Sequence, residues 1–250
     1  MRESVDVTEL DDIDRNFNSY NMPMQLEYDS LTGLLCRGSF LEKAANDIPD
    51  LLKRFGHTVI ITLDLKDMKG FNSSYGQEEG DRLLCGIADI LKQHFGNEHC
   101  SRFGEDRFYV FTRAVGIEIE LNGIIKQIQN INNGHTLPVR MGICAINDDR
   151  LSVDIACDRA RMACDTLRES YDSGFVWFDE RLADETTRKE YIIKNLDTAI
   201  SKGWIQVYLQ PVIRTLTGEL CGFEALSRWQ DPKYGLLLPG DFIRILEQTD

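Results

Sequence analysis

Apolar residues follow two spacings along the chain, and each spacing predicts one kind of element. Between Ser39 and Phe55 they recur every three or four residues, which predicts an amphipathic helix with Ser39 as its N-cap. The next run, VIITL at 59–63, is short and β-branched and predicts a buried strand. The same criteria predict a turn-rich segment at 70–80, helices over about 81–95, 117–130 and 152–170, and strands at 101–103, 108–111, 139–145 and 175–178.

The order of these elements predicts the fold class. A strand, a helix, a hairpin around a turn at 104–107, a helix, a strand, a helix and a strand follow one another. This order is typical of an α+β fold, in which helices pack on a mixed sheet of the ferredoxin-like or palm kind. Beyond it, the pattern predicts a helix over 180–202, strands at 205–209 and 220–229 around a turn at 215–218, and a helix from 239.

Three carboxylates mark the predicted sheet. Asp64 ends the first strand, and Glu105 and Asp106 lie at the tip of the hairpin. In a palm sheet the first strand and the hairpin are neighbours, so these side chains can converge, bind Mg²⁺ and orient a triphosphate. The alternative is that they are ordinary solvated acids at a strand end and a turn.

Composition limits the kinds of partner. The net charge of the 250 residues is −13, which disfavours binding to nucleic-acid backbones but leaves small nucleotides open. The seven cysteines form no CxxC pair, and we interpret them as reduced core residues of a cytoplasmic protein. No apolar run approaches the ~20 residues of a membrane span, and residues 1–27 form an acidic leader without the features of a signal peptide.

Several motifs resemble those of GGDEF domains. DSLTGL at 29–34 resembles the DxLTGL opening of that family, and the segment 64–81 resembles its metal strand followed by YGHxxGD. RFGEDRF at 102–108 occupies the place of RYGGDEF. The resemblance covers residues 28–179 and implies the GGDEF fold.

This family condenses two GTP molecules into cyclic di-GMP, and the resemblance implies site residues by position. Asp64 through its side chain, Leu65 through its carbonyl and Asp106 would bind Mg²⁺. Asn72 and Asp81 would hydrogen-bond the guanine of GTP.

The motif departs from the family at charged positions. The run Gly104, Glu105, Asp106, Arg107, Phe108 has glutamate where the family has its second glycine, which allows a tight turn beside the phosphates. Arg107 replaces a glutamate, and Asp165 and Glu169 replace two phosphate-binding cations. We therefore expect an inactive cyclase site, and we hypothesise that Arg107 and Asp165 pair and plug the pocket. The inhibitory RxxD motif is also absent, since Phe95 and Glu98 stand near its place.

The end of the chain resembles the start of an EAL domain. Gln210-Pro211, GFEALSRW at 222–229 and the following Pro232, Gly235 and Pro239 carry this resemblance. It implies a partial (β/α) barrel over 203–250, with Glu224 as a metal ligand and Gln210, Leu226 and Arg228 as substrate contacts. Cyclic di-GMP would bind only to a complete EAL domain. The apolar residues Trp204, Val207, Leu209 and Phe223 would need a covering partner.

Together these observations predict a regulatory GGDEF module that binds a guanine nucleotide, or dimerises through a linker helix at 180–202, and serves an EAL phosphodiesterase domain. Two alternatives stay open. One is a purely structural interaction domain with an empty pocket. The other is an active diguanylate cyclase, against which the charge changes argue.

Overall fold

The computed structural model describes residues 27–148, 150–168 and 170–247. The chain divides into two compact units, the first ending at Phe178 and the second beginning at Asp179. The predicted acidic leader lies outside the described residues except for Glu27.

The first unit is built on a five-stranded mixed sheet. Its strands are β1 (Thr58–Leu65), β2 (Cys100–Arg102), β3 (Arg107–Arg113), β4 (Val139–Ile146) and β5 (Gly174–Trp177). They lie in the order β2-β3-β1-β4-β5, with β1 antiparallel to both of its neighbours and β4 parallel to β5. Every residue of β1 is buried, which confirms the strand predicted from its apolar run.

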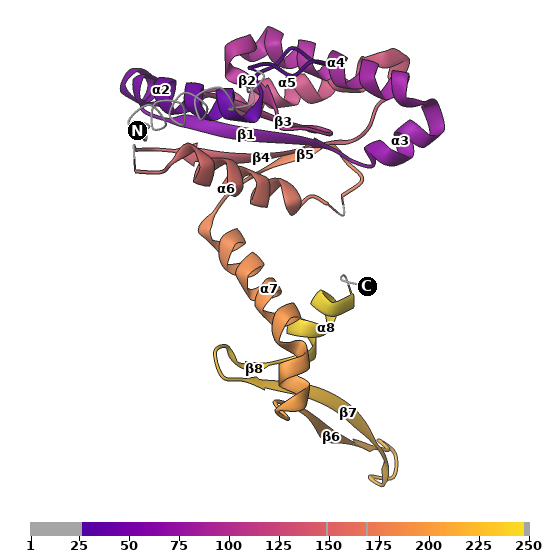
Figure 1. The fold of residues 1–250 in the computed structure, drawn as a ribbon. Helices are drawn as coiled ribbons and strands as arrows, with labels where there is room; N and C mark the ends of the chain where they lie inside the picture. Colours follow the sequence, from indigo (N-terminus) through magenta and orange to yellow (C-terminus); the bar gives the residue numbers. More distant parts are fainter. Residues whose placement is uncertain (1–26, 149, 169, 248–250) are drawn as a thin grey trace, which may run out of the picture. The chain divides into compact units, whose positions relative to one another are not determined.

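Helices cover both faces of this sheet (Figure 1). They are α2 (Arg37–Phe55), α3 (Met68–Tyr75), α4 (Gln77–Phe95), α5 (Ile117–Asn130) and α6 (Val153–Asp165). Because side chains alternate along a strand, Ile61 and Leu63 of β1 pack in the same cluster as α4 and α5, whereas Ile60 packs with α2 and α6. The predicted α+β fold is confirmed.

Two local predictions are wrong. The turn-rich segment at 70–80 is mostly helical, since the Asp67 carboxylate accepts a hydrogen bond from the Gly70 amide at 3.0 Å and so caps α3. Gly76, with φ of 88°, separates α3 from α4. The first helix begins at Arg37 after the N-cap Cys36, and no side chain caps it, so Ser39 is not its N-cap.

The helix predicted over 152–170 is shorter than expected. Its predicted start is right, because the Ser152 hydroxyl accepts a hydrogen bond from the Ile155 amide at 3.4 Å. The helix ends at Asp165, where the Thr166 hydroxyl donates to the Ala163 carbonyl at 2.7 Å. Turns follow it to residue 168.

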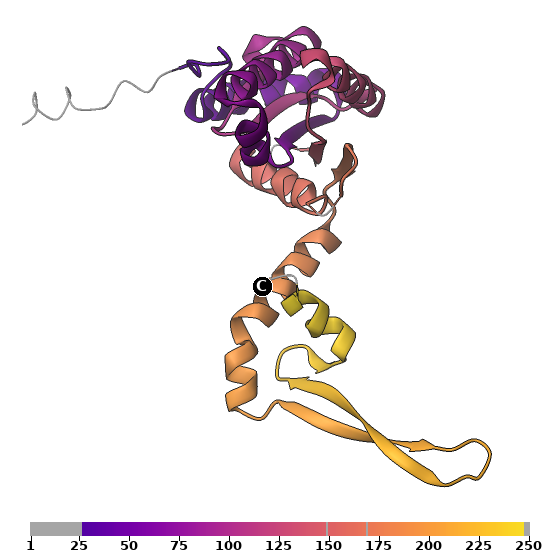
Figure 2. The same cartoon turned by 90° about the vertical axis from the view of Figure 1, so that its right-hand side faces the viewer.

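The second unit pairs two helices with an antiparallel sheet. Its elements are α7 (Glu180–Ser201), β6 (Ile205–Ile213), β7 (Leu220–Asp231), β8 (Gly235–Leu237) and α8 (Pro239–Glu247). In Figure 2, β6 and β7 form a long ribbon that extends beyond α8. The small core of the unit consists of Ile192, Ala199, Trp229, Leu237 and Phe242.

The sequence missed β8. The buried carboxylate of Asp231 accepts hydrogen bonds from the amides of Lys233 and Tyr234, both at 2.8 Å, and this bends the chain back after β7. Trp204 packs against the small core of its own unit, so it does not need the covering partner that the sequence indicated. Val207 and Phe223 are exposed, as the sequence predicted.

The cysteines are all free. Cys100, Cys144, Cys157 and Cys164 are buried in the first unit, and burial raises the pKa of Cys100 to about 12. Cys221 is exposed, so it is not the core residue that the sequence indicated. Within the described residues, no helix is both long enough and apolar enough to cross a membrane.

Strand β4 approaches the backbone of α6 closely at Gly142. A Cβ atom there would lie 1.9 Å from the Ala160 carbonyl oxygen and 2.4 Å from the Cys164 amide nitrogen, both in the backbone of α6. We predict that Gly142→Ala lowers the free energy of unfolding by about 3 kcal/mol, because backbone cannot give way as a flexible side chain does.

Urea unfolding followed by circular dichroism measures this loss. The matched control is Gly123→Ala in α5, where a Cβ would meet nothing within 4 Å and alanine should stabilise the helix by about 0.5–1 kcal/mol. Equal effects of the two substitutions would contradict the packing argument.

Candidate functional site

A cavity of about 470 Å³ lies where β1, the β2–β3 turn and the α3–α4 segment meet. Most of the predicted site residues of the first unit line this cavity, together with basic residues that sequence reasoning missed. Its lining includes Asp64, Leu65, Asp67, Lys69, Asn72, Gln77, Asp81, Arg102, Glu105, Asp106, Arg140 and Arg168.

Asp64 is held by an arginine. Strand register places it opposite Arg140 of β4, and its carboxylate accepts a hydrogen bond from Arg140 Nη2 at 2.6 Å. The two side chains are only 13% and 10% exposed, so the ion pair is largely shielded from water. The signal in the sequence was a single charged residue in the otherwise apolar run VRMGICAI at 139–146.

The β2–β3 turn adopts the left-handed backbone that glycine favours. Gly104 has φ of 104° and Glu105 has φ of 47°. Arg102 clamps this turn, since its Nε donates to the Glu105 carbonyl at 2.9 Å and its Nη1 donates to Asp29 Oδ1 at 3.1 Å. The same Asp29 oxygen accepts from the Thr32 amide at 2.8 Å. The motif at 29–34 therefore supports the turn.

Asp106 lies on the other side of Asp64 from the β4 strand. Burial raises the pKa of its carboxyl above the ordinary 3.8, and the nearby carboxylate of Asp64 raises it further. Asp64 and Asp106 are thus close enough to interact, as the sequence suggested.

The donor set does not fit Mg²⁺ in this arrangement. Magnesium takes near-octahedral oxygen ligands, commonly one or two carboxylates with waters and substrate phosphates completing the shell, so Asp64 and Asp106 are the side chains that would have to supply them. The guanidinium of Arg140 donates a hydrogen bond to Asp64 Oδ2, so this oxygen is not free to bind a metal.

Asn72 and Asp81 are joined by a residue that sequence reasoning did not single out. Gln77 accepts from Asn72 Nδ2 at 3.3 Å and donates to Asp81 Oδ1 at 3.2 Å. The Asn72 Oδ1 atom is buried and has no hydrogen-bond partner among the described residues. A Cβ atom at position 80 would lie 2.0 Å from Asn72 Oδ1, so the Asn72 side chain can lie here only because residue 80 is glycine.

Arg107 and Asp165 do not plug the cavity. Arg107 lines a different cavity, of about 290 Å³, together with Asp154 and Asp158. Asp165 forms an ion pair with Arg168 at 3.3 Å, and no ion pair joins it to Arg107 within the described ranges. The plug hypothesis is therefore wrong, because neither Arg107 nor Asp165 lines the cavity of Asp64. Glu169 lies outside the described residues.

The two residues near the place of RxxD serve other contacts. Phe95 is buried in the core of the first unit. Glu98 forms an ion pair with Lys43 at 3.1 Å.

In the second unit, the EAL-like residues share one face of the β6–β7 ribbon. Gln210 pairs directly with Glu224, and Leu226 and Arg228 follow at alternate positions of β7. Glu224 is exposed, and the guanidinium of Arg228 donates to the Ser227 carbonyl at 2.7 Å. Their roles in metal or substrate binding stay predictions.

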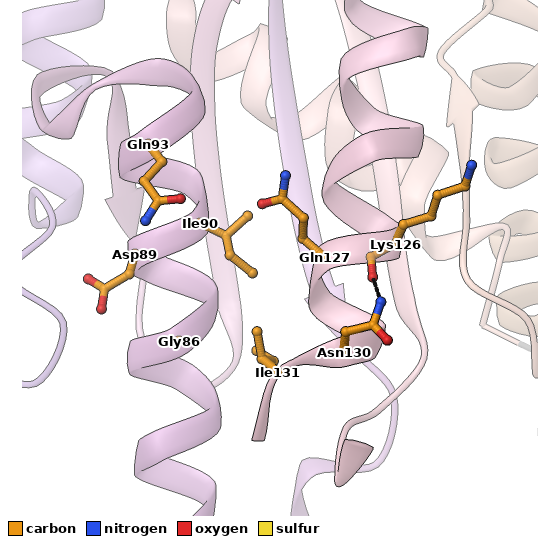
Figure 3. A pocket seen from close by; sticks show the side chains of 8 residues that line it. All are labelled: Gly86, Asp89, Ile90, Gln93, Lys126, Gln127, Asn130 and Ile131. Atoms are coloured by element: carbon orange, nitrogen blue, oxygen red, sulfur yellow. Dashed lines mark hydrogen bonds between the residues drawn. The ribbon is translucent and has the colours of Figure 1, made fainter. Parts of the chain in front are cut away.

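A second hollow lies between α4 and α5 (Figure 3). It measures about 540 Å³, and Ile90 and Ile131 face one another at its floor beneath exposed polar side chains such as Gln93 and Gln127. It contains no residue of the motifs described above, so we do not assign it as the functional site.

Comparison with known proteins agrees with this architecture. The family model described as "Diguanylate cyclase, GGDEF domain" matches residues 26–172, and the model described as "EAL domain" matches residues 193–250. The crystal structure of the GGDEF domain of DgcB from Caulobacter crescentus in complex with c-di-GMP aligns with a TM-score of 0.53 at 18% identity, covering 63% of this chain and 98% of that one.

Curated relatives extend over both units. An uncharacterized signaling protein of Caulobacter vibrioides is 30% identical over 238 residues, and the cyclic di-GMP phosphodiesterase PdeR of Escherichia coli K12 is 28% identical over 240 residues. These alignments cover 89% and 88% of this chain but 29% and 34% of the relatives. The chain thus spans about a third of their length.

The fold and the cavity define an α+β protein whose site lies where a central strand end meets a hairpin turn. The chain belongs to the GGDEF family, and its second unit contains the start of an EAL domain.

The strained turn generates one prediction. A residue other than glycine in the left-handed region costs about 1–2 kcal/mol. We therefore predict that Glu105→Gly raises the free energy of unfolding by about 0.5–1 kcal/mol, since glycine returns part of the gain as chain entropy. Chemical unfolding measures the change. Glu105→Ala, which keeps the backbone strain, should give no comparable gain, and a gain equal to that of glycine would contradict the argument.

The raised pKa of Asp106 leads to a prediction about the pH dependence of stability. Its ionised form is disfavoured in the folded protein, so its contribution to stability is present at acid pH and is lost as the pH rises through the folded-state pKa. We predict that Asp106→Asn raises the melting temperature at pH 7 by a few degrees, and that the gain disappears as the pH falls towards 3.8.

Thermal melts across this pH range check the prediction. Asp158→Asn, at an exposed position of α6, is the control and should change the melting temperature little at any pH. A gain from Asp106→Asn that persists unchanged at acid pH would contradict the assignment.

Proposed function

We propose that the GGDEF domain of this chain is a non-catalytic module that binds a guanine nucleotide and regulates an EAL phosphodiesterase domain of the same protein. The observation that carries this proposal is the cavity of about 470 Å³, whose lining includes Asn72 and Asp81, the proposed guanine contacts, together with Glu105 and Arg140.

The residues at the proposed guanine end of the cavity support retained recognition of a guanine base. The buried Asn72 Oδ1 has no partner among the described residues, and a buried acceptor without a donor is costly. The N1–H and exocyclic amino groups of guanine are hydrogen-bond donors, and the side-chain oxygens of Asn72 and Asp81 can accept their hydrogen bonds. Gln77 would release both side chains when the base enters.

The phosphate end argues against cyclase activity. Glu105 adds a carboxylate at the strained turn beside the cavity, and the Asp64 carboxylate is already bound by the guanidinium of Arg140. Magnesium bridging the phosphates is what such phosphoryl chemistry requires. We therefore propose GTP as a regulatory ligand and not as a substrate.

The EAL part of the proposal rests on the second unit and on relatives. PdeR of Escherichia coli is named a cyclic di-GMP phosphodiesterase, and MucR of Pseudomonas aeruginosa is named a bifunctional diguanylate cyclase and cyclic di-GMP phosphodiesterase. A complete EAL domain would supply the metal and cyclic di-GMP site to which Gln210 and Glu224 contribute. Residues from many strand ends build a barrel site, so the 193–250 segment alone does not suffice.

A second candidate is a purely structural interaction domain with an empty pocket. The hydrogen bonds of Gln77 favour it, because they satisfy Asn72 Nδ2 and Asp81 without any ligand. Such a domain could still dimerise, and the exposed Ile193 and Ile200 of α7 would be part of that surface.

Calorimetric titration of GTP and GDP in Mg²⁺ buffer into the 250-residue chain separates the two. We predict micromolar binding, with cyclic di-GMP as a comparison ligand. Asp81→Ala should weaken GTP binding at least tenfold, because charged hydrogen bonds to a ligand contribute about 1.5–3 kcal/mol.

Asp89→Ala is the matched control, since it removes an exposed carboxylate from the same helix. It should leave GTP binding unchanged. If wild type gives no heat with GTP or GDP at millimolar concentration, the interaction domain with an empty pocket is the better description.

A further inference from the structure

Arg140 is a buried cation at the point where a metal ion would be expected. It is 8% exposed, it lines the cavity, and its Nη2 contacts Asp64 at 2.6 Å. Strand β4 delivers it there because Asp64 and Arg140 are directly opposite in the β1–β4 register. Nothing on a loop has to move to form this pair.

The guanidinium retains hydrogen-bonding capacity. Its Nη1 reaches the Arg168 carbonyl only at 3.5 Å, and its buried Nε has no partner in the described part of the chain. A buried donor without an acceptor is rare in native proteins and is commonly satisfied by a ligand or an ordered water. Phosphate oxygens fit such a donor, since the planar guanidinium matches their geometry.

The other charges around the cavity are already engaged or exposed. Arg102 is bound to Asp29 and to the turn carbonyl, and Arg168 is paired with Asp165 at the surface. Lys69 is exposed at the rim. Among the acids of the cavity, Asp106 lies close enough to Asp64 for the two carboxylates to interact. Arg140 is therefore the buried counter-charge of this pair of carboxylates.

A divalent cation at Asp64 would have to break this ion pair and lie beside the guanidinium. Removing one partner of a buried pair leaves the other charge uncompensated, which is strongly unfavourable. The repulsion between the metal and the guanidinium adds to that cost.

We propose that Arg140 takes the place of a divalent cation in this site. It neutralises Asp64, excludes a metal ion from that carboxylate and offers its guanidinium to an anionic phosphate, so that guanine nucleotide binds without metal. The exclusion of metal stands on the Asp64–Arg140 geometry alone, whereas the nucleotide part rests on the proposed function.

Binding of Mn²⁺, followed by the electron paramagnetic resonance signal of the free ion, tests the exclusion. The 250-residue wild type and its Asp64→Asn variant should bind the same amount of Mn²⁺, because Asp64 is not a ligand. Arg140→Ser should gain about one equivalent of bound Mn²⁺ at sub-millimolar concentration, and the double variant with Asp64→Asn should lose it again.

Circular dichroism establishes that Arg140→Ser is folded. If it is not, Arg140→Gln is used, which keeps much of the side-chain volume and removes the charge. Wild type that binds more Mn²⁺ than Asp64→Asn would overturn the proposal. So would a folded, uncharged variant at position 140 that gains no site.

GTP titration in EDTA and in Mg²⁺ tests the nucleotide part. Wild type should bind with dissociation constants that agree within about twofold in the two buffers, and Arg140→Ser should bind at least tenfold more weakly in EDTA. Binding that weakens tenfold or more when Mg²⁺ is removed from wild type would overturn this part. Absence of GTP binding in both buffers would contradict the proposed function, and the Mn²⁺ result would still decide whether Arg140 excludes metal.

Discussion

The central position of β1 is the constraint on which the first unit depends. It pairs with β3 on one side and β4 on the other, and helices cover both of its faces, so all eight of its residues are buried. A strand held this way has no freedom to shift its register, because a slip by one residue would move every side chain to the other face. Asp64, near its end, is therefore fixed opposite Arg107 on β3 and Arg140 on β4.

The two arginines nevertheless differ in their contacts. Both are directly opposite Asp64, but Arg140 forms the ion pair and Arg107 lines the cavity on the side of α2 and α6. The charge changes in the hairpin motif thus have separate consequences. Glu105 changes the backbone and the charge of the turn, whereas Arg107 contributes to a neighbouring surface. Arg140, which lies outside the motif, lines the same cavity as Glu105 of the motif.

The second unit has a different balance of burial. Five buried residues form its core, and α7 contributes Ile192 and Ala199 to it, so this helix is part of the unit and does more than connect two domains. The β6–β7 ribbon keeps Val207, Leu209 and Phe223 exposed on one face. The opposite face carries Gln210 and Glu224, and the two faces follow from the strict alternation of a strand.

The sequence by itself determined the order of elements, the hairpin and the family resemblance, because apolar periodicity and turn residues are local signals. It also predicted Asp64, Asp81 and Asp106 as site residues, and the structure shows that all three line one cavity. Tertiary structure decided the rest. Arg140 acquired its role only from a partner 76 residues away in the sequence, and tertiary packing decided that Arg107 lines a different cavity from that of Asp64. The physical reason is that ion pairing depends on register and face, which no single stretch of sequence contains.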